Sequence, residues 1–267
     1  MTPFDVALPH PRASAFTIVL RNVLVWRKLL GPSLAFSFGE PVIYLLGLGF
    51  GLGQFIGEVN GIPYFTFLAS GLLAATAMNV ASFEGMFSVY TRMTHQQTYD
   101  AILATPLQVD DIVAGETLWC ASKSVLNTIP ILVVATLLGA IHSWSALGAI
   151  PVFFLVGLCF AGPAIVAAAF APSYDFFNYY TTLLITPMFI FSGVFYPVAT
   201  LPPLAQTIVN ILPLSHAIAL IRPLVAGLPL VAGLPLAEPW LHFGVLLVYA
   251  VVGYVVATIC IRRRLIR

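Results

Sequence analysis

The sequence predicts an all-α integral membrane protein. Of its 267 residues, 60% are hydrophobic and only 8% are charged, whereas soluble domains carry about 25% charged residues. A membrane-spanning helix needs roughly 20 mostly apolar residues. Six segments meet that length, at 35–56, 63–88, 118–140, 147–170, 177–197 and 240–261. We therefore expect six transmembrane helices within one domain that covers residues 1–267.

Basic residues set the expected orientation of these spans. If both termini are cytoplasmic, all of the 11 Lys and Arg residues except Arg222 lie on the cytoplasmic side, where such residues are enriched in membrane proteins. The opposite orientation would reverse this ratio. We therefore predict cytoplasmic N and C termini. We also expect no nucleic-acid partner.

The segment 13–30 precedes the first span and repeats apolar side chains at a helical period, with Arg21, Arg27 and Lys28 among them. Such a pattern is typical of an amphipathic helix that lies in the membrane interface. The alternative is a frayed helix in the cytoplasm.

The first span ends in a run of glycines at alternate positions. Gly47 pairs with Gly51 and Gly49 with Gly53 at the four-residue spacing that lets two membrane helices approach closely. We interpret the run as a packing surface, either within the chain or across a dimer.

Two acidic residues fall within predicted spans, Glu40 in the first and Glu84 in the second. Ionisable groups in membrane helices are costly and mark functional sites by default. Pairing with Arg27, Lys28 or Arg92 is one interpretation, and a role in gating or in the translocation path is the other.

Between the second and third spans lies a polar run, residues 90–100, which must lie outside the hydrocarbon. A membrane protein with one such loop on its cytoplasmic side is expected to use it to contact a cytoplasmic partner. Thr105 and Pro106 then resemble the N-cap and first position of the helix that leads into the third span, with Gln108 completing a capping box.

Aromatic residues close the fifth span, namely Phe189, Phe191, Phe195 and Tyr196. They fit interfacial anchors or the lining of a lipid or glycan path. Prolines are dense between 196 and 239, which forbids one continuous helix. We expect short re-entrant helices at 203–211 and 214–225 that dip into the outer leaflet. A hexapeptide, Leu-Val-Ala-Gly-Leu-Pro, occurs at 224–229 and again at 230–235 as a loop duplication.

The sequence excludes some chemistry. Walker A loops carry a Lys after Gly, whereas the only two lysines, Lys28 and Lys123, follow Arg and Ser. The three cysteines lack metal-ligand spacing. We therefore expect no catalytic residue, metal site or cofactor in this chain. An intramembrane hydrolase that pairs Ser192 with His216 or His242 is the rival enzyme class, although no nucleophile-elbow pattern surrounds the serine. A passive channel is a further alternative.

Taken together, the interfacial helix, six spans, polar loop and half-dipping helices resemble the permeases of the ABC-2 family of ABC transporters. The resemblance covers nearly the whole chain and is carried by residues 40–53, Ala-Ser-Phe-Glu at 81–84, residues 98–106, and Asp-Ile-Val-Ala-Gly-Glu at 111–116. Within that family the chain is most similar to the NodJ-type permeases, which are associated with lipo-oligosaccharide export.

The resemblance implies a homodimer in the bacterial inner membrane that binds two separate ATPase subunits. ATP and Mg²⁺ would be bound by those partners, and the substrate would be an acylated or lipid-linked glycan. Export of drugs or other hydrophobic small molecules by the same machinery is the alternative. A departure from the family pattern is the duplicated hexapeptide, which enlarges the outer region.

The resemblance also implies a coupling helix at 94–104 that docks on the ATPase. Tyr99, Ile102 and Leu103 recur at i, i+3 and i+4 and would form its apolar docking stripe. The polar contacts would come from the remaining residues of the segment, Thr94, His95, Gln96, Gln97, Thr98 and Asp100.

Overall fold

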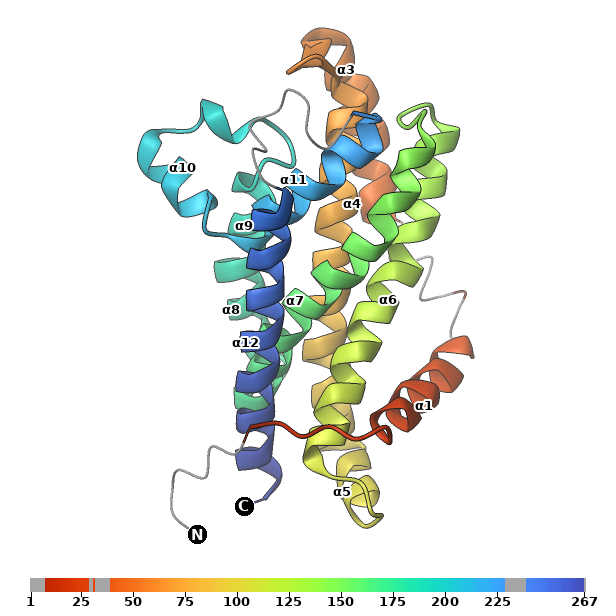
Figure 1. Cartoon of the computed structure of the whole chain (residues 1–267), viewed down its shortest axis with the longest axis vertical. Coiled ribbons are helices and arrows are strands. Elements are labelled where there is room, and N and C mark those ends of the chain that lie inside the picture. Colours follow the sequence, from red (N-terminus) through yellow and green to blue (C-terminus); the bar gives the residue numbers. More distant parts are fainter. Residues whose placement is uncertain (1–7, 29–30, 32–38, 229–238, 267) are drawn as a thin grey trace.

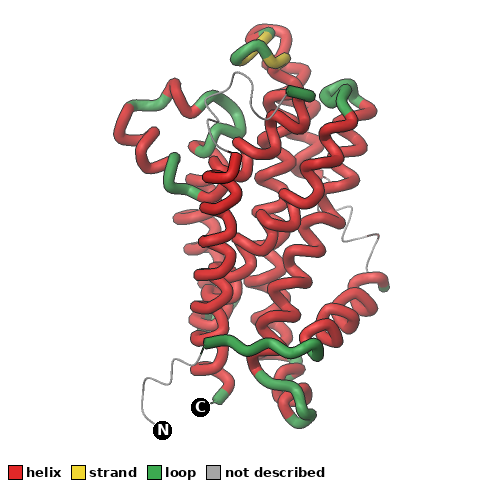
Figure 2. The backbone as a smooth tube through the Cα atoms, viewed as in Figure 1, coloured by secondary structure: helices red, strands yellow, loops and turns green. Residues whose placement is uncertain are grey.

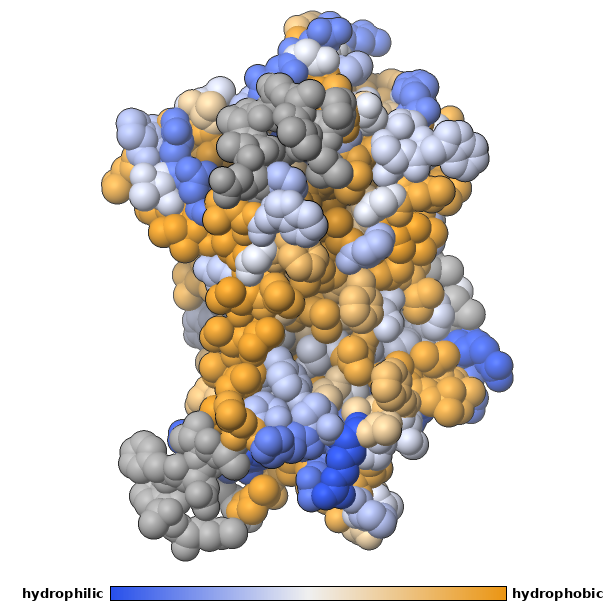
Figure 3. All heavy atoms as spheres, in the orientation of Figure 1, coloured by the Kyte–Doolittle hydropathy of each residue, from blue (hydrophilic) through white to orange (hydrophobic). Residues whose placement is uncertain are grey.

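The computed structural model describes residues 8–28, 31, 39–228 and 239–266. Its long helices run side by side along the long axis of the molecule and form an elongated bundle (Figures 1 and 2). Side chains of apolar residues cover the middle of the face shown in Figure 3, and polar residues gather toward both ends. The described chain therefore has the polarity of a protein that crosses a membrane.

Among the described residues, five helices are long and apolar enough to cross a membrane, or six if the bent pair Pro203–Val209 and Pro213–Ala226 forms one span. The spans are Gly39–Ile56, Tyr64–His95, Val109–Leu137 (α6), Trp144–Phe170 and Pro239–Leu265 (α12). The first span contains the π-helical turn η1 (Leu45–Phe50) and α3 (Gly51–Ile56). The fourth joins η4 (Trp144–Gly148) to α7 (Ala149–Phe170). These elements follow the predicted spans one to four and six.

The predicted fifth span is shorter than the others. A 16-residue apolar helix, Phe176–Phe191, consists of α8 (Phe176–Tyr180), the π-helical turn η5 (Thr181–Ile185) and α9 (Thr186–Phe191). It ends before the predicted boundary at 197, because Gly193 adopts a positive φ of 90° that terminates the helix.

The second span is longer than predicted and continues to His95 rather than ending at 88. It consists of α4 (Tyr64–Phe83), the π-helical turn η2 (Glu84–Ser88), a short α-helical link and a second π-helical turn, η3 (Thr91–His95). The helix continues because Val89, Tyr90 and Met93 keep an apolar face that is buried in the protein. The first part of the polar run is therefore helix and not loop.

The remaining elements connect these helices. The amphipathic segment forms α1 (Ala15–Arg27), α5 is Thr98–Leu103, and a two-stranded antiparallel hairpin pairs β1 (Glu58–Val59) with β2 (Ile62–Pro63). After the short helix η6 (Val198–Thr200) come α10 (Pro203–Val209) and α11 (Pro213–Ala226), which are bent by 82° relative to each other. The second copy of the hexapeptide, at 230–235, lies outside the described residues.

The predicted start of α6 is wrong. The helix begins at Val109, and its capping box is formed by Gln108 and Asp111 instead of Thr105 and Gln108. The Gln108 backbone N–H donates to the Asp111 carboxylate at 3.1 Å. Thr105 instead donates its hydroxyl to the Ile102 carbonyl, which closes the end of α5.

The two ends of the bundle differ in their elements. α5, residues 8–14 and the end of α12 lie together at what we call the α5 end (Figure 1). The hairpin, α3 and the loop between α6 and η4 lie at the opposite, α3 end. The core between them is packed closely where small residues meet, as at Gly162 of α7, which touches the backbone of Gly253 in α12. Any side chain at Gly162 would push these two helices apart.

Candidate functional site

Four charged side chains form a buried cluster near the α5 end of the bundle. Glu84 and Arg92 come from the second span, and Glu116 and Lys123 come from α6. Arg92 donates to Glu84 at 2.8 Å and to Glu116 at 2.5 Å. Lys123 donates to the other oxygen of Glu84 at 2.5 Å. We call these four residues the charge cluster.

The charge cluster is neutral in sum and nearly closed to solvent. The side chains of Glu84 and Glu116 are 3% and 1% exposed, and those of Arg92 and Lys123 are 12% and 19% exposed. An unpaired charge in such a place would cost several kcal/mol. Mutual pairing therefore explains how two carboxylates persist within apolar helices.

Two neutral side chains extend the charge cluster. The Trp119 indole N–H donates to Glu84 at 2.8 Å, and the Asn22 amide of α1 donates to Glu116 at 3.0 Å. α1 approaches α6 this closely because Gly115 lacks a side chain, and a Cβ there would lie 2.5 Å from Ile18. The cluster thus joins the amphipathic helix, the second span and the third span in one contact network.

Tyr99 attaches α5 to the second span and to α6. Its ring is only 1% exposed and belongs to the apolar cluster that includes Met93 of the second span and Ile112 of α6, while its hydroxyl has no hydrogen-bond partner among the described residues. Burial, together with the negative charge of Glu116, raises the pKa of the Tyr99 phenol well above its ordinary value. Tyr99 is therefore neutral and belongs to the interior of the protein.

The burial of Tyr99 corrects the predicted docking stripe. The i, i+3, i+4 pattern is present, but its side faces the bundle: Tyr99 is buried, and Ile102 and Leu103 are half-buried against the same apolar cluster. A partner at this end would meet Asp100 and Ala101, which are exposed.

The predicted single helix at 94–104 is also broken. η3 ends at His95, and α5 starts only at Thr98. Between them Gln97 adopts the left-handed conformation, with φ 48° and ψ 30°, which a continuous right-handed helix does not contain. Exposed residues Thr94, His95, Gln96 and Gln97 and half-buried Thr98 therefore form a corner beside α5.

A second set of contacts ties this corner to the loop before α8. The His95 ring stacks on Tyr174 with 5.3 Å between ring centroids, and the Thr91 hydroxyl lies 2.7 Å from the Tyr174 hydroxyl. Tyr90 donates to the carbonyl of Pro172 at 2.9 Å. Because Tyr99 beside this corner packs in a cluster with residues of α6, a displacement of the corner would move both α6 and the loop before α8.

Acidic residues in the first turn of α6 hold both chain termini at the α5 end. Asp110 accepts from Arg262 of α12 at 2.5 Å and from the backbone N–H of His10 at 2.8 Å. Asp111 accepts from the backbone N–H of Arg12 at 2.7 Å. Residues 8–14 thus cross the end of the bundle as a strap (Figure 1).

The candidate gating residues are not brought together in one site. Glu84 belongs to the charge cluster, where its predicted pairing with Arg92 is present, whereas Glu40 is exposed and has no ion pair among the described residues. Phe189 and Phe195 pack on each other and on Tyr44 of the first span, with centroid distances of 5.0–6.1 Å. This contact joins the first and fifth spans near the α3 end. Phe191 is exposed, and Tyr196 is half-buried.

Among the four glycines of the first span, Gly49 alone makes a close approach. Its position touches the Phe65 ring of α4, whereas Gly47 and Gly51 have no atom within 4 Å of an added Cβ, and for Gly53 the nearest atom, in Tyr64, is 3.9 Å away. The packing interpretation thus holds within the chain for Gly49. Gly47 and Gly51 lie on a face that the described chain leaves uncovered.

In the described part of the chain, Ser192 forms no hydrogen bond with His216 or His242. Ser192 is buried, and its hydroxyl has no hydrogen-bond partner among the described residues. The two histidines bond elsewhere, since His216 and His242 share a 2.6 Å contact between their Nδ1 atoms and His216 also contacts the Asn210 carbonyl. A serine nucleophile requires a base within hydrogen-bond reach.

The described residues contain no group of three His, Cys, Asp or Glu side chains that could hold a metal ion. Cys120 and Cys159 are buried, Cys260 is half-buried, and all three are free thiols.

Several residues of the charge cluster were not singled out as functional by the sequence. Glu116 and Lys123 each bind a residue of the second span, 24 and 39 positions away in the chain. No sequence pattern singles out Trp119 and Asn22 as functional residues. Their hydrogen bonds to Glu84 and Glu116 join residues that are 35 and 94 positions apart in the chain.

Comparison with known proteins identifies a family and several relatives that match most of this chain. The sequence profile of the ABC-2 type transporter matches residues 15–225. Nodulation protein J of Rhizobium leguminosarum bv. viciae is 45% identical over 260 residues, covering 97% of this chain and 98% of that protein. Nodulation protein J of Rhizobium meliloti (strain 1021) is 43% identical over 262 residues, covering 98% of each. The inner membrane transport permease YadH of Escherichia coli (strain K12) is 26% identical over 247 residues, covering 91% of each.

Proposed function

The chain belongs to the ABC-2 type transporter family as a permease, and we propose that it exports an acylated or lipid-linked oligosaccharide across the bacterial inner membrane. In this proposal a separate ATPase subunit binds ATP and Mg²⁺ and supplies the energy. Two copies of the chain and two ATPase subunits form the transporter. The α5 end, with both termini, faces the cytoplasm.

The observation that carries the proposal is the buried packing of α5 against the second span and α6, the two helices that hold the charge cluster. α5 and the corner before it protrude from the bundle with an exposed polar surface, while Tyr99 anchors them to the second and third spans. A force applied to the exposed side of α5 would therefore reach helices that cross the membrane. This arrangement fits a permease that is moved by a partner.

The movement would pass through charged hydrogen bonds, which have defined geometry and resist stretching. Arg92 is the central residue because it binds one carboxylate on each of two spans. The π-helical turn η2 begins at Glu84, and such turns frequently occur at functional sites. We infer that the second span bends at this turn when α5 is displaced.

The substrate class rests on the relatives. The relatives that are 43–45% identical to this chain over nearly their whole length are named nodulation protein J, and the NodJ-type permeases are associated with export of lipo-oligosaccharides. The amphiphile would cross where two copies meet, beside the first and fifth spans. The uncovered face at Gly47 and Gly51 supports that placement.

Transport into inside-out membrane vesicles tests the proposal. Vesicles that contain this chain and its ATPase are supplied with a fluorescent acylated oligosaccharide, with and without ATP. We expect ATP-dependent accumulation that is lost when either protein is omitted. Transport of a hydrophobic dye but not of the oligosaccharide would support the drug-exporter alternative and contradict the proposed substrate. Flux without ATP or partner would support a channel.

A further inference from the structure

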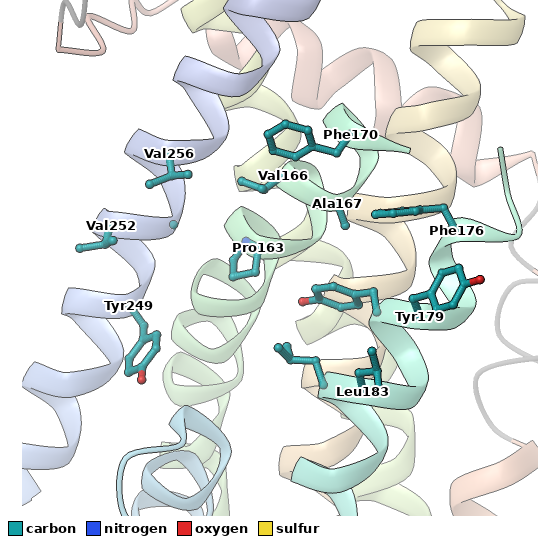
Figure 4. Close-up of a pocket in the computed structure, with 13 residues that line it drawn as sticks. Pro163, Val166, Ala167, Phe170, Phe176, Tyr179, Leu183, Tyr249, Val252 and Val256 are labelled. Atoms are coloured by element: carbon teal, nitrogen blue, oxygen red, sulfur yellow. The ribbon is translucent and has the colours of Figure 1, made fainter. Parts of the chain in front are cut away.

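We propose that an apolar groove on the side of the bundle binds one acyl chain of an anionic membrane phospholipid, whose head group lies beside Arg263. The groove runs between α12 and the α8–η5 segment, over α7 (Figure 4). It lies on the α12 side of the fifth span, whereas the contacts of Tyr44 with Phe189 and Phe195 join that span to the first. The groove is therefore separate from the proposed substrate path.

Three elements build the groove. The floor is formed by α7, one wall by α12, and the other wall by α8 and η5. The lining includes Pro163 on the floor, Val252, Gly253 and Val256 on the first wall, and Phe176 and Leu183 on the second.

The packing of the helices keeps the groove open. Gly253 holds α12 against Gly162 and Pro163 of α7, and α8 also packs on α7. Both walls therefore rest on one helix and leave a recess between them. The recess is open to the side, because Leu183 is 74% exposed and Val252 is 55% exposed.

The size and chemistry of the recess fit one hydrocarbon chain. Its volume is about 620 Å³. A water molecule occupies about 30 Å³ in the liquid and a methylene group is of similar size, so the recess has room for about 20 methylene groups. None of the lining residues is charged, and polar head groups would find no partners on the floor.

The charge at the α5 end of the groove favours an anionic head group. Val252, Val256 and Arg263 share one face of α12, because they are spaced by four and seven residues. Arg263 lies about 10 Å beyond Val256 along the helix axis. Its side chain is exposed, and no described residue forms an ion pair with it. Basic residues at the end of a membrane helix attract anionic lipids.

The neighbouring charges leave this role to Arg263. Arg262 binds Asp110, and Arg264 donates to the carbonyls of Ala169 and Ala171 at the end of α7. The opposite wall contributes one exposed acid, Asp175, just before Phe176. Arg263 and Arg264 carry two positive charges, and Asp175 carries one negative charge. The α5 end of the groove is therefore positive in sum. A choline head group would bring a cation to Arg263 and be disfavoured.

Lipid binding to the purified chain tests the proposal. The protein in detergent is titrated with dioleoyl phosphatidylglycerol or with dioleoyl phosphatidylcholine, and bound lipid is counted by native mass spectrometry. We expect one phosphatidylglycerol to bind roughly tenfold more tightly than phosphatidylcholine. Val252→Trp fills the groove and should abolish that site, and Val256→Phe provides a second filled groove if the first variant does not fold.

Matched variants separate the groove from the general lipid surface. Val251→Trp places the same ring on the next residue of α12, which is 54% exposed but does not line the groove, and should bind lipid as the wild type does. Arg263→Gln should remove the preference for phosphatidylglycerol, and Arg263→Lys should retain it. Equal binding by the filled and control variants, or an unchanged preference in Arg263→Gln, would overturn the proposal.

A competition experiment identifies the kind of molecule whose acyl chain occupies the groove. If an acylated oligosaccharide displaces phosphatidylglycerol from the wild type, the groove takes the transported substrate and the phospholipid assignment is wrong. We expect no displacement. Because the binding measurement needs no ATPase, it stands or falls independently of the proposed transport function.

Discussion

Among the described residues, Arg92 alone binds carboxylates of two spans, and replacing it by leucine removes that cation. The side chain of Arg92 is 12% exposed, and those of its partners Glu84 and Glu116 are 3% and 1% exposed. Glu84 keeps Lys123 and the Trp119 indole after the change. Glu116 keeps the hydrogen bond from the Asn22 amide and becomes a buried charge with no ion pair among the described residues.

The expected cost follows from that stranded charge. Breaking a buried ion pair by removing one partner costs roughly 3–5 kcal/mol, and we expect Arg92→Leu to lower the free energy of unfolding by this amount. Adding Glu116→Gln removes the charge and keeps an acceptor for Asn22, so the double variant should regain at least half of the loss. Arg27→Leu, at an exposed arginine of α1, should change stability by less than about 0.5 kcal/mol.

Unfolding of the two single variants and the double variant in mixed micelles measures these differences. The double variant also separates stability from coupling, because it lacks the Arg92–Glu116 ion pair, while the contacts of Lys123 and Trp119 with Glu84 still join the two spans. We expect it to reach the membrane and bind the ATPase, yet to show reduced transport. Arg92→Leu with the stability of the wild type, or a double variant less stable than Arg92→Leu, would refute the pairing. Normal transport by the double variant would refute its role in transmission.

Three further outcomes follow from the structure. Tyr99→Ala should lower the free energy of unfolding by roughly 3–5 kcal/mol because it leaves a cavity at a buried site. Tyr99→Phe should retain most of the stability in the same unfolding assay. Equal losses of stability in the two variants would contradict the packing role of the ring. Gly49→Leu should destabilise the protein because the new side chain would clash with the Phe65 ring, whereas a leucine at Gly47 would meet no atom of the same chain. Thermal unfolding of the two variants measures this difference. A Gly49→Leu variant as stable as the wild type would contradict the helix contact. Ser192→Ala should leave vesicle transport unchanged, and a lost activity would revive the hydrolase alternative.

Composition and period were sufficient to predict the helices. Long apolar runs have few stable alternatives to helix in a membrane, and the described long helices follow five predicted spans. The errors occur where the runs end. The helix after Ser88 continues because Tyr90 and Met93 are buried by contacts with distant segments, and no local pattern reports such contacts.

The candidate site was predictable in part. The sequence indicated that Glu84 could pair with Arg92, eight residues away in the chain, and the polar segment marked the protruding end. It did not indicate that Lys123 would bind Glu84, because the two residues are 39 positions apart. Nor could a helical period decide which side of α5 faces the bundle. Only the packing of α5 against α6 and the second span buries Tyr99 and exposes Asp100.

The proposed function requires that the ATPase docks on the exposed side of α5. A cysteine at Asp100 tests this docking directly, because two of the native thiols are buried and the third is half-buried. The control Trp144→Cys places an exposed thiol at the first residue of η4, which follows the loop from α6 at the α3 end. We predict that a short bifunctional reagent crosslinks Asp100→Cys to the ATPase subunit and that Trp144→Cys gives no such product. Crosslinking from Trp144→Cys, or none from Asp100→Cys in a complex that hydrolyses ATP, would contradict the account.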